Sequence, residues 1–105
     1  MSEFRRVCAL SDLDEESALH VDVDGTPVCV ARSHGRVYAV RDVCSHAEVP
    51  LSEGDVEDGT VECWLHGSRF DLATGKPIGL PATVPVPVYP VKTEGDDVLV
   101  AVADQ

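Results

Sequence analysis

The sequence predicts an all-β protein, and three observations support this fold class. Apolar and polar residues alternate with a period of two in several short stretches, which is typical of strands that have one buried face. Turn signals separate these stretches at short intervals, as in an antiparallel meander. The chain has 105 residues, which suits one domain with a single core rather than two. We therefore expect a single domain over residues 1–105.

The first part of the chain predicts three strands. An apolar run over residues 4–10 leads into an acidic stretch, where either Ser11 or Asp12 caps a turn of helix or the stretch is a solvated loop. Alternation over residues 18–24 indicates a half-buried strand and places His20 on its solvent side. Turns at residues 24–27 and 33–35, the second with His34 at its tip, lead to strands at 28–31 and 36–40. Neither histidine is expected to have a special role.

Residues 42–82 are expected to form a small inserted β subdomain. Asp58-Gly59 is a hairpin turn signal, a strand follows at 61–65, and residues 71–76 resemble another hairpin. After the insertion, Val84, Val86 and Val88 alternate with prolines, which predicts an edge or extended segment. A last turn at 94–97 precedes a final strand at 98–102. Residues 1–41 and 83–105 would together form the base of the fold.

Charge and cysteine usage limit the partners and the compartment. The net charge of −11 would repel nucleic acid and anionic membranes, and it favours a partner with a basic docking face. The N-terminal residues lack the apolar core of a signal peptide, and prolines interrupt the longest uncharged stretch. Cys8 and Cys29 lie in apolar runs and are expected to be buried thiols, which is typical of a reducing compartment. We expect a cytoplasmic protein.

Two short motifs carry the chemistry, Cys44-Ser45-His46 and Cys63-Trp64-Leu65-His66, with sixteen residues between them. The four residues could be unrelated core and surface positions, or they could hold a structural zinc ion. Zinc sites, however, usually pair like ligands, as C-x2-4-C followed by H-x3-5-H. One thiol and one imidazole in each loop suit a binuclear iron-sulfur cluster better, with both thiolates on one iron and both imidazoles on the other.

The motifs resemble the two cluster-binding loops of the Rieske family. The resemblance continues through Ser68, Phe70 and Asp71 to Thr74-Gly75-Lys76, includes a third loop at Gly79-Leu80-Pro81-Ala82, and spans about Val7 to Val102. It implies a Rieske-like antiparallel β-sandwich whose inserted subdomain, residues 42–82, binds one [2Fe-2S] cluster per chain. By the same resemblance, Cys44 and Cys63 would bind the inner iron, and His46 and His66 the iron nearest the surface.

The resemblance implies an electron carrier and not an enzyme. Four ligands leave no open metal position, and the chain is too short for the second, mononuclear iron domain of a Rieske oxygenase. Members of the high-potential branch carry a disulfide between the loops, where this chain has Val49 and Leu65, and a tyrosine where it has Phe70. Ser68 stands where that branch has a serine bonded to a bridging sulfide. Fewer hydrogen bonds to sulfur predict a potential toward the low end of the roughly −150 to +300 mV range.

A carrier of this kind resembles the ferredoxin component of bacterial ring-hydroxylating dioxygenase systems. This implies an NAD(P)H-dependent flavin reductase as electron donor, a terminal non-haem iron oxygenase as acceptor, and a monomeric carrier. Trp64 would either shield the cluster or contact a partner. The acidic residues near the motifs would steer docking or only keep the protein soluble: Glu48, Glu53, Asp55, Glu57, Asp58 and Glu62. Two alternatives within the family are an accessory protein of iron-sulfur assembly and the small subunit of a nitrite reductase.

Overall fold

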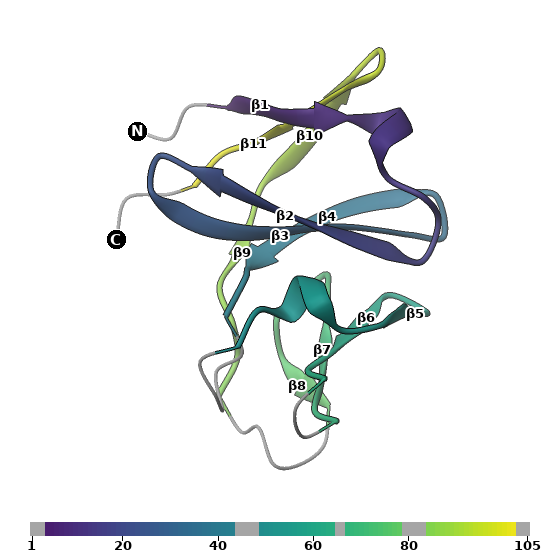
Figure 1. Cartoon of the computed structure of the whole chain (residues 1–105), viewed down its shortest axis with the longest axis vertical. Helices are drawn as coiled ribbons and strands as arrows, with labels where there is room; N and C mark the ends of the chain where they lie inside the picture. The colour runs from purple at the N-terminus through teal and green to yellow at the C-terminus, as the bar shows by residue number, and fades with distance from the viewer. Residues whose placement is uncertain (1–3, 44–48, 65–66, 79–83, 103–105) are drawn as a thin grey trace.

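The computed structural model describes residues 4–43, 49–64, 67–78 and 84–102. Within these ranges the chain forms short antiparallel strands in three sheets, together with two single turns of 3-10 helix (Figure 1). No helix in the described ranges is long and apolar enough to cross a membrane. The predicted all-β class, with its antiparallel arrangement, is confirmed.

Each sheet has a simple order of neighbours. Sheet A has the order β1-β11-β10, with β1 at Arg5–Ala9, β10 at Val91–Glu94 and β11 at Asp97–Val100. Sheet B has the order β2-β3-β4-β9, with β2 at Ser17–Val23, β3 at Thr26–Ser33, β4 at Arg36–Arg41 and β9 at Val88–Tyr89. Sheet C has the order β5-β6-β7-β8, with β5 at Val56–Glu57, β6 at Thr60–Glu62, β7 at Arg69–Asp71 and β8 at Pro77–Ile78.

Tight hairpins fix the register of these strands. In three of them both turn residues have positive φ, the geometry that type I′ turns require and that matches the twist of the strands. These turns are Asp24-Gly25 between β2 and β3, His34-Gly35 between β3 and β4, and Asp58-Gly59 between β5 and β6. The turns predicted at these three places are therefore confirmed.

The acidic stretch after β1 contains a helical turn, as one of the two alternatives predicted. This turn, η1, spans Leu10–Asp12. Asp12 lies inside it, where its carboxylate accepts the N–H of Ala9 at 3.0 Å. Asp96 bonds the hydroxyl of Ser11 at 3.0 Å. The turn is thus held to the β10–β11 hairpin, and neither Ser11 nor Asp12 is its N-terminal cap.

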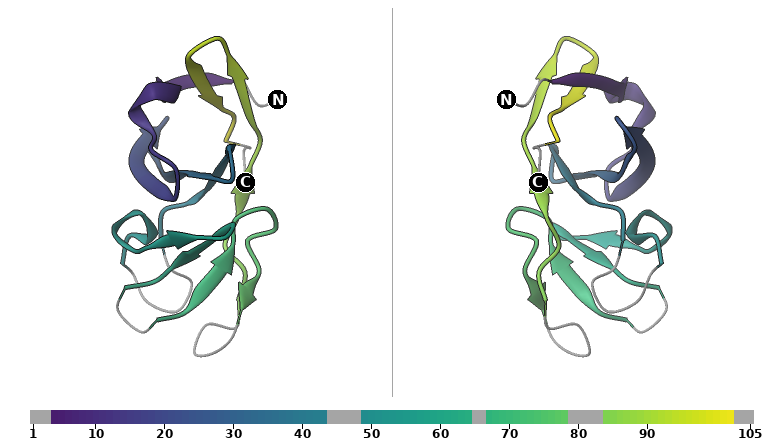
Figure 2. Two further views of the ribbon diagram at one scale, coloured as in Figure 1. Left: turned by 90° about the vertical axis from the view of Figure 1, so that its right-hand side faces the viewer. Right: turned by 90° about the vertical axis from the view of Figure 1, so that its left-hand side faces the viewer.

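Sheet B lies in the middle of the molecule and buries both of its faces, so the described chain has two cores and not the single core expected from its length. Figure 2 shows sheets A and B curving around one interior, with sheet C below them. The first core, between sheets A and B, contains Cys8, Leu13, Val23, Val28, Val30, Ala39, Val98 and Val100. The second core, between sheets B and C, contains Cys29, Ala31, Val40, Leu51, Val56, Val61, Cys63, Phe70, Leu72 and Val86. Strand β3 alternates between the two, because successive side chains of a strand point to opposite faces.

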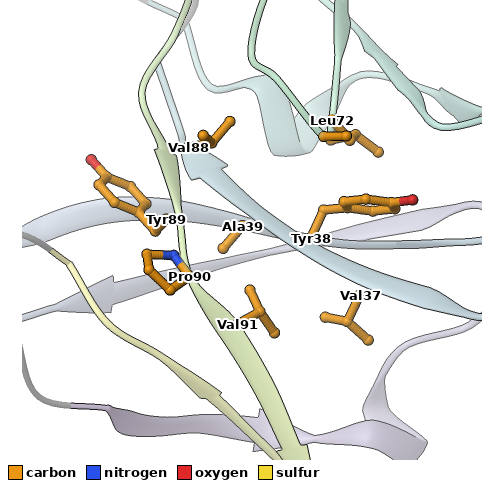
Figure 3. A pocket seen from close by; sticks show the side chains of 9 residues that line it. Val37, Tyr38, Ala39, Leu72, Val88, Tyr89, Pro90 and Val91 are labelled. Carbon is orange, nitrogen blue, oxygen red and sulfur yellow. The ribbon is translucent and has the colours of Figure 1, made fainter.

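The segment from β9 to β10 passes from sheet B to sheet A at Pro90. β9 pairs with β4, whereas β10 pairs with β11. Pro90 has no N–H to donate, and its carbonyl accepts the N–H of Ala101 at 3.1 Å. Figure 3 shows this crossing beside a mostly apolar hollow of about 390 Å³ that Tyr38 and Leu72 also line. β9 is the edge strand of sheet B, which confirms the edge position predicted from the prolines.

Candidate metal centre

The second motif begins at a buried cysteine held in a closed turn. The side chain of Cys63 follows β6 and lies in the second core. Its N–H donates to the carbonyl of Ser68 at 2.6 Å, and the N–H of Gly67 donates to the carbonyl of Cys63 at 2.9 Å. Gly67 has φ of 75°, a conformation that glycine adopts without steric cost. The backbone therefore fixes Cys63 at the base of a tight turn, and His66 lies outside the described residues.

The structure describes the residues on either side of the first motif. Cys44 and His46 lie outside the described residues, as does the predicted third loop at 79–82. Asp42 precedes the motif, and its carboxylate is fully buried. It accepts the N–H of Ser52 at 2.7 Å and the Ser52 hydroxyl at 2.6 Å. Ser52 belongs to η2, Leu51–Glu53, whose Leu51 is in the second core.

A close backbone approach joins the segment that follows the first motif to the strand that precedes the second. Gly54 directly follows η2, and a Cβ atom placed on it would lie 1.6 Å from the carbonyl oxygen of Glu62. The N–H of Glu62 also donates to the carbonyl of Asp55 at 2.8 Å. The chain that leaves the first motif thus lies against the strand that enters the second. The strand that leads to Cys63 therefore lies beside the segment that follows the first motif, which a metal centre shared by the two motifs requires.

The two positions that the sequence singled out behind the motif are both buried. Phe70, in β7, pairs with Val61 and lies in the same core as Cys63. Ser68 is 1% exposed. An apolar ring at residue 70 keeps water out of this core without offering a hydroxyl. The low potential inferred from Phe70 stays a prediction.

Cys8 and Cys29 are buried free thiols, as expected. Desolvation by burial raises the pKa of both, with a further contribution to Cys8 from the nearby Asp12 carboxylate. A thiol with a raised pKa stays protonated and is a poor metal ligand and nucleophile. Cys29 is in the same core as Cys63, so the two differ in sequence context and not in burial.

The two histidines that were expected to have no role each contact a carboxylate. His20 Nδ1 lies 2.5 Å from Asp42 Oδ2, and His34 Nε2 lies 3.1 Å from Asp58 Oδ1. The side chain of His20 is 47% exposed. Its predicted exposure is therefore correct, but its contact with the buried Asp42 was not expected. The partners are 22 and 24 residues away in sequence, which is why local patterning did not find them.

The contact with Asp42 predicts a pH dependence of stability. Its hydrogen bond raises the pKa of His20, and the nearby Asp22 carboxylate adds to this. The folded state therefore binds this proton more tightly than the unfolded state does. The stabilisation is complete below the unfolded pKa of about 6.5 and is lost as the pH rises through the higher folded pKa. We expect less than about 1 kcal/mol, because the imidazole is half-exposed.

Urea unfolding of the wild type and of His20→Asn between pH 5 and 9 measures this contribution. The difference in free energy of unfolding between the two proteins should shrink as the pH rises. A difference that stayed constant across this range would contradict the raised pKa.

Comparison with known proteins adds to this geometry. Residues 3–90 match the family model of the Rieske [2Fe-2S] domain. The chain is 44% identical over 95 residues to the ferredoxin component of biphenyl 2,3-dioxygenase from Rhodococcus jostii (strain RHA1), covering 90% of this chain and 89% of the relative.

Solved structures give the same likeness. The ferredoxin of carbazole 1,9a-dioxygenase from Nocardioides aromaticivorans IC177 has a TM-score of 0.88 and 40% identity, covering 92% of this chain and 95% of that one. A chain in the complex of reduced oxygenase and oxidised ferredoxin in carbazole 1,9a-dioxygenase has a TM-score of 0.88 and 36% identity, covering 93% and 92%.

Proposed function

The chain belongs to the Rieske [2Fe-2S] domain family, and from this premise we propose that it serves as the electron-carrying ferredoxin of a ring-hydroxylating dioxygenase system. The observation that carries the proposal is the likeness over almost the whole chain to relatives that are themselves dioxygenase ferredoxins. These relatives are electron-transfer components and not the catalytic subunits. The sequence identity of 44% and 40% to these ferredoxins favours this role over iron-sulfur assembly or nitrite reduction.

Within this proposal, Cys44 and Cys63 bind one iron of a [2Fe-2S] cluster, and His46 and His66 bind the other. The support is the donor set itself, the burial of Cys63 and the backbone contact between the ends of the two motifs. A bound cluster of this type takes up and releases one electron at a time. The chain holds the Cys63 sulfur in a core from which Phe70 and Leu51 exclude water.

Two protein partners follow from the role. We propose that the acceptor is a terminal non-haem iron oxygenase, since a similar chain was solved in complex with an oxygenase. The donor is an NAD(P)H-dependent flavin reductase, and the carrier acts as a cytoplasmic monomer, binding neither nucleic acid nor membrane. The 50% exposed Trp64 lies within the second motif, directly after Cys63, where it can contact either partner.

One spectroscopic experiment tests the cofactor and its ligands. The purified protein is reduced with dithionite, its electron paramagnetic resonance spectrum is recorded, and its iron and sulfide are counted. We expect a rhombic signal with an average g below that of the free electron and about two iron and two sulfide per chain. A colourless protein with one zinc and no sulfide would overturn the electron-carrier role.

The acidic side chains near the motifs predict a salt-dependent rate of electron delivery. Glu57 and Glu62 share Arg69, whereas Glu53 and Asp55 have no ion pair among the described residues. Their charge can attract a basic docking face over long range, an attraction that salt screens. We expect the second-order rate with the oxygenase to fall about tenfold from low salt to about 0.5 M.

Stopped-flow reduction of the oxygenase by the ferredoxin measures that rate. The double variant Glu53→Gln, Asp55→Asn should be slower at low salt and show a flatter salt dependence. The variant Asp14→Asn, which neutralises an acid in the base of the fold, is the matched control. Equal salt dependence of all three proteins would show that these two acids only solubilise the chain.

A further inference from the structure

A buried carboxylate joins Asp42 and Ser52, which flank the segment that carries the first ligand motif and are called its ends below. Asp42 follows β4, and Ser52 lies in η2; between them are residues 43–51, which include Cys44 and His46. Asp42 Oδ1 accepts the Ser52 N–H at 2.7 Å, and Oδ2 accepts the Ser52 hydroxyl at 2.6 Å. The Asp42 N–H donates to the carbonyl of Pro27 at 3.0 Å, which ties this end to sheet B. The two ends of the motif are therefore fixed to each other and to the fold.

His20 supplies the third contact to the carboxylate, and it comes from elsewhere in the fold. Strand β2 needs no imidazole at this position to pair with β3, where His20 lies opposite Cys29. The Asp42 side chain is fully buried, and a buried charge is costly unless donors surround it. The two donors of Ser52 belong to one end of the motif, whereas the imidazole of His20 belongs to neither end. Among the described residues, removing it leaves the Asp42 carboxylate with its two bonds from Ser52.

We propose that His20 is a positioning residue of the electron-transfer site, because it holds the buried Asp42 carboxylate in the geometry that closes the first ligand motif through Ser52. The inference rests on the proposed function in one respect, since the motif is taken to bind the cluster. Its effect follows from charge and geometry. When one donor is lost, less of the negative charge on the carboxylate is compensated. The ends of the motif are also held less firmly.

Both consequences can be measured on the cluster. More uncompensated negative charge beside the motif disfavours the reduced, more negative cluster, so the reduction potential falls. We expect His20→Leu to lower the ratio of reduced to oxidised protein about threefold at fixed solution potential. This corresponds to a reduction potential lower by about 28 mV, since a tenfold change in this ratio corresponds to about 59 mV for a one-electron couple. A motif whose ends are loosened should also lose its cluster to a chelator about threefold faster than wild type.

Three further variants separate this role from general stability. His20→Asn keeps an N–H donor near the place of Nδ1 and should restore more than half of both effects. His34→Gly removes an imidazole that also contacts a carboxylate, Asp58, but lies at the β3–β4 turn, and glycine accepts its φ of 52°. It should leave both values at those of wild type. Ser52→Ala, which loses only the hydroxyl bond, should lower the ratio of reduced to oxidised protein in the same direction by about twofold, since one hydrogen bond from a neutral donor is lost.

The experiment is redox titration and chelator-induced bleaching of the purified holoproteins at one pH. Hydrogen exchange of the Ser52 amide accompanies it and should be faster in His20→Leu than in wild type. Unchanged potential and bleaching in His20→Leu, or changes of equal size in His34→Gly, would overturn the proposal. If His20→Leu does not load the cluster, Ser52→Ala decides, and a wild-type potential there would also overturn it.

These readouts keep the two proposals distinct. None of them needs the reductase or the oxygenase, so the positioning role can be confirmed even if the partners differ. A wild type without a [2Fe-2S] signal would overturn the proposed function instead. Exchange at the Ser52 amide would then still test the contact between His20, Asp42 and Ser52.

Discussion

Replacing Cys63 by serine is expected to abolish the metal centre while the fold remains. A serine hydroxyl is a far poorer ligand for iron than a thiolate, and the side chain stays buried at the base of the 63–68 turn. Iron bound per chain should fall to less than about one tenth of the wild-type value, and the visible colour and the rhombic signal should disappear. Iron and sulfide assays on the purified variant, with electron paramagnetic resonance, measure the loss.

Cys29 provides a matched control for this change. It has the same complete burial and lies in the same core, but it is outside both motifs. Cys29→Ser should lower the free energy of unfolding by about 1–3 kcal/mol, because it buries a hydroxyl where a thiol was. It should nevertheless retain two irons per chain. A Cys63→Ser protein that keeps the wild-type spectrum would remove this residue from the ligand set.

The second large effect is expected from Gly54→Ala, which adds one methyl group where two backbone segments touch. The new Cβ would lie 1.6 Å from the carbonyl oxygen of Glu62, and the nearest atoms belong to the backbone and cannot rotate away. Either η2 or β6 has to move, so the junction between the two motifs opens. We expect the free energy of unfolding to fall by about 3 kcal/mol or more, at the upper end of overpacking effects.

Urea unfolding and cluster content of the same variant measure the two consequences together. The control is Gly25→Ala in the β2–β3 turn, where a Cβ has no neighbour within 4 Å but φ is +85°. Gly25→Ala adds only the backbone strain of a positive φ, so the free energy of unfolding should fall by about 1 kcal/mol. The iron content should stay at that of wild type. Similar costs at Gly25 and Gly54 would mean that the contact between η2 and β6 is easily relaxed.

Most of the fold was predictable because it is encoded locally. Alternation around Leu19, Val21 and Val23 follows from the period of a strand, and Asp58-Gly59 follows from the positive φ that a tight hairpin needs. The [2Fe-2S] assignment rested on the pairing of one cysteine with one histidine in each motif, and the family match supports it. Of the four proposed ligands, the structure describes Cys63, and the placement of the other three stays a prediction.

The features that sequence reasoning missed depend on residues far apart in the chain. Asp42 is acidic and precedes a loop, so its complete burial had no local signal. Its contact with His20 joins β2 to the end of β4. The sequence around Gly54 likewise carries no sign that the absence of a side chain there leaves room for the carbonyl of Glu62. A pattern within one strand or turn carries no information about the partner on another.

The double burial of sheet B limits how this protein can be divided and recombined. Cys29, Ala31 and Val40 form one wall of the core that contains Cys63 and Phe70. A transplant of residues 42–82 into a foreign scaffold would leave that wall behind and open the sulfur end of the motif to water. A working chimera has to carry β2, β3 and β4 as well. The smallest segment that can be transferred with its metal centre is therefore determined by the core that sheets B and C share, and not by the ends of residues 42–82.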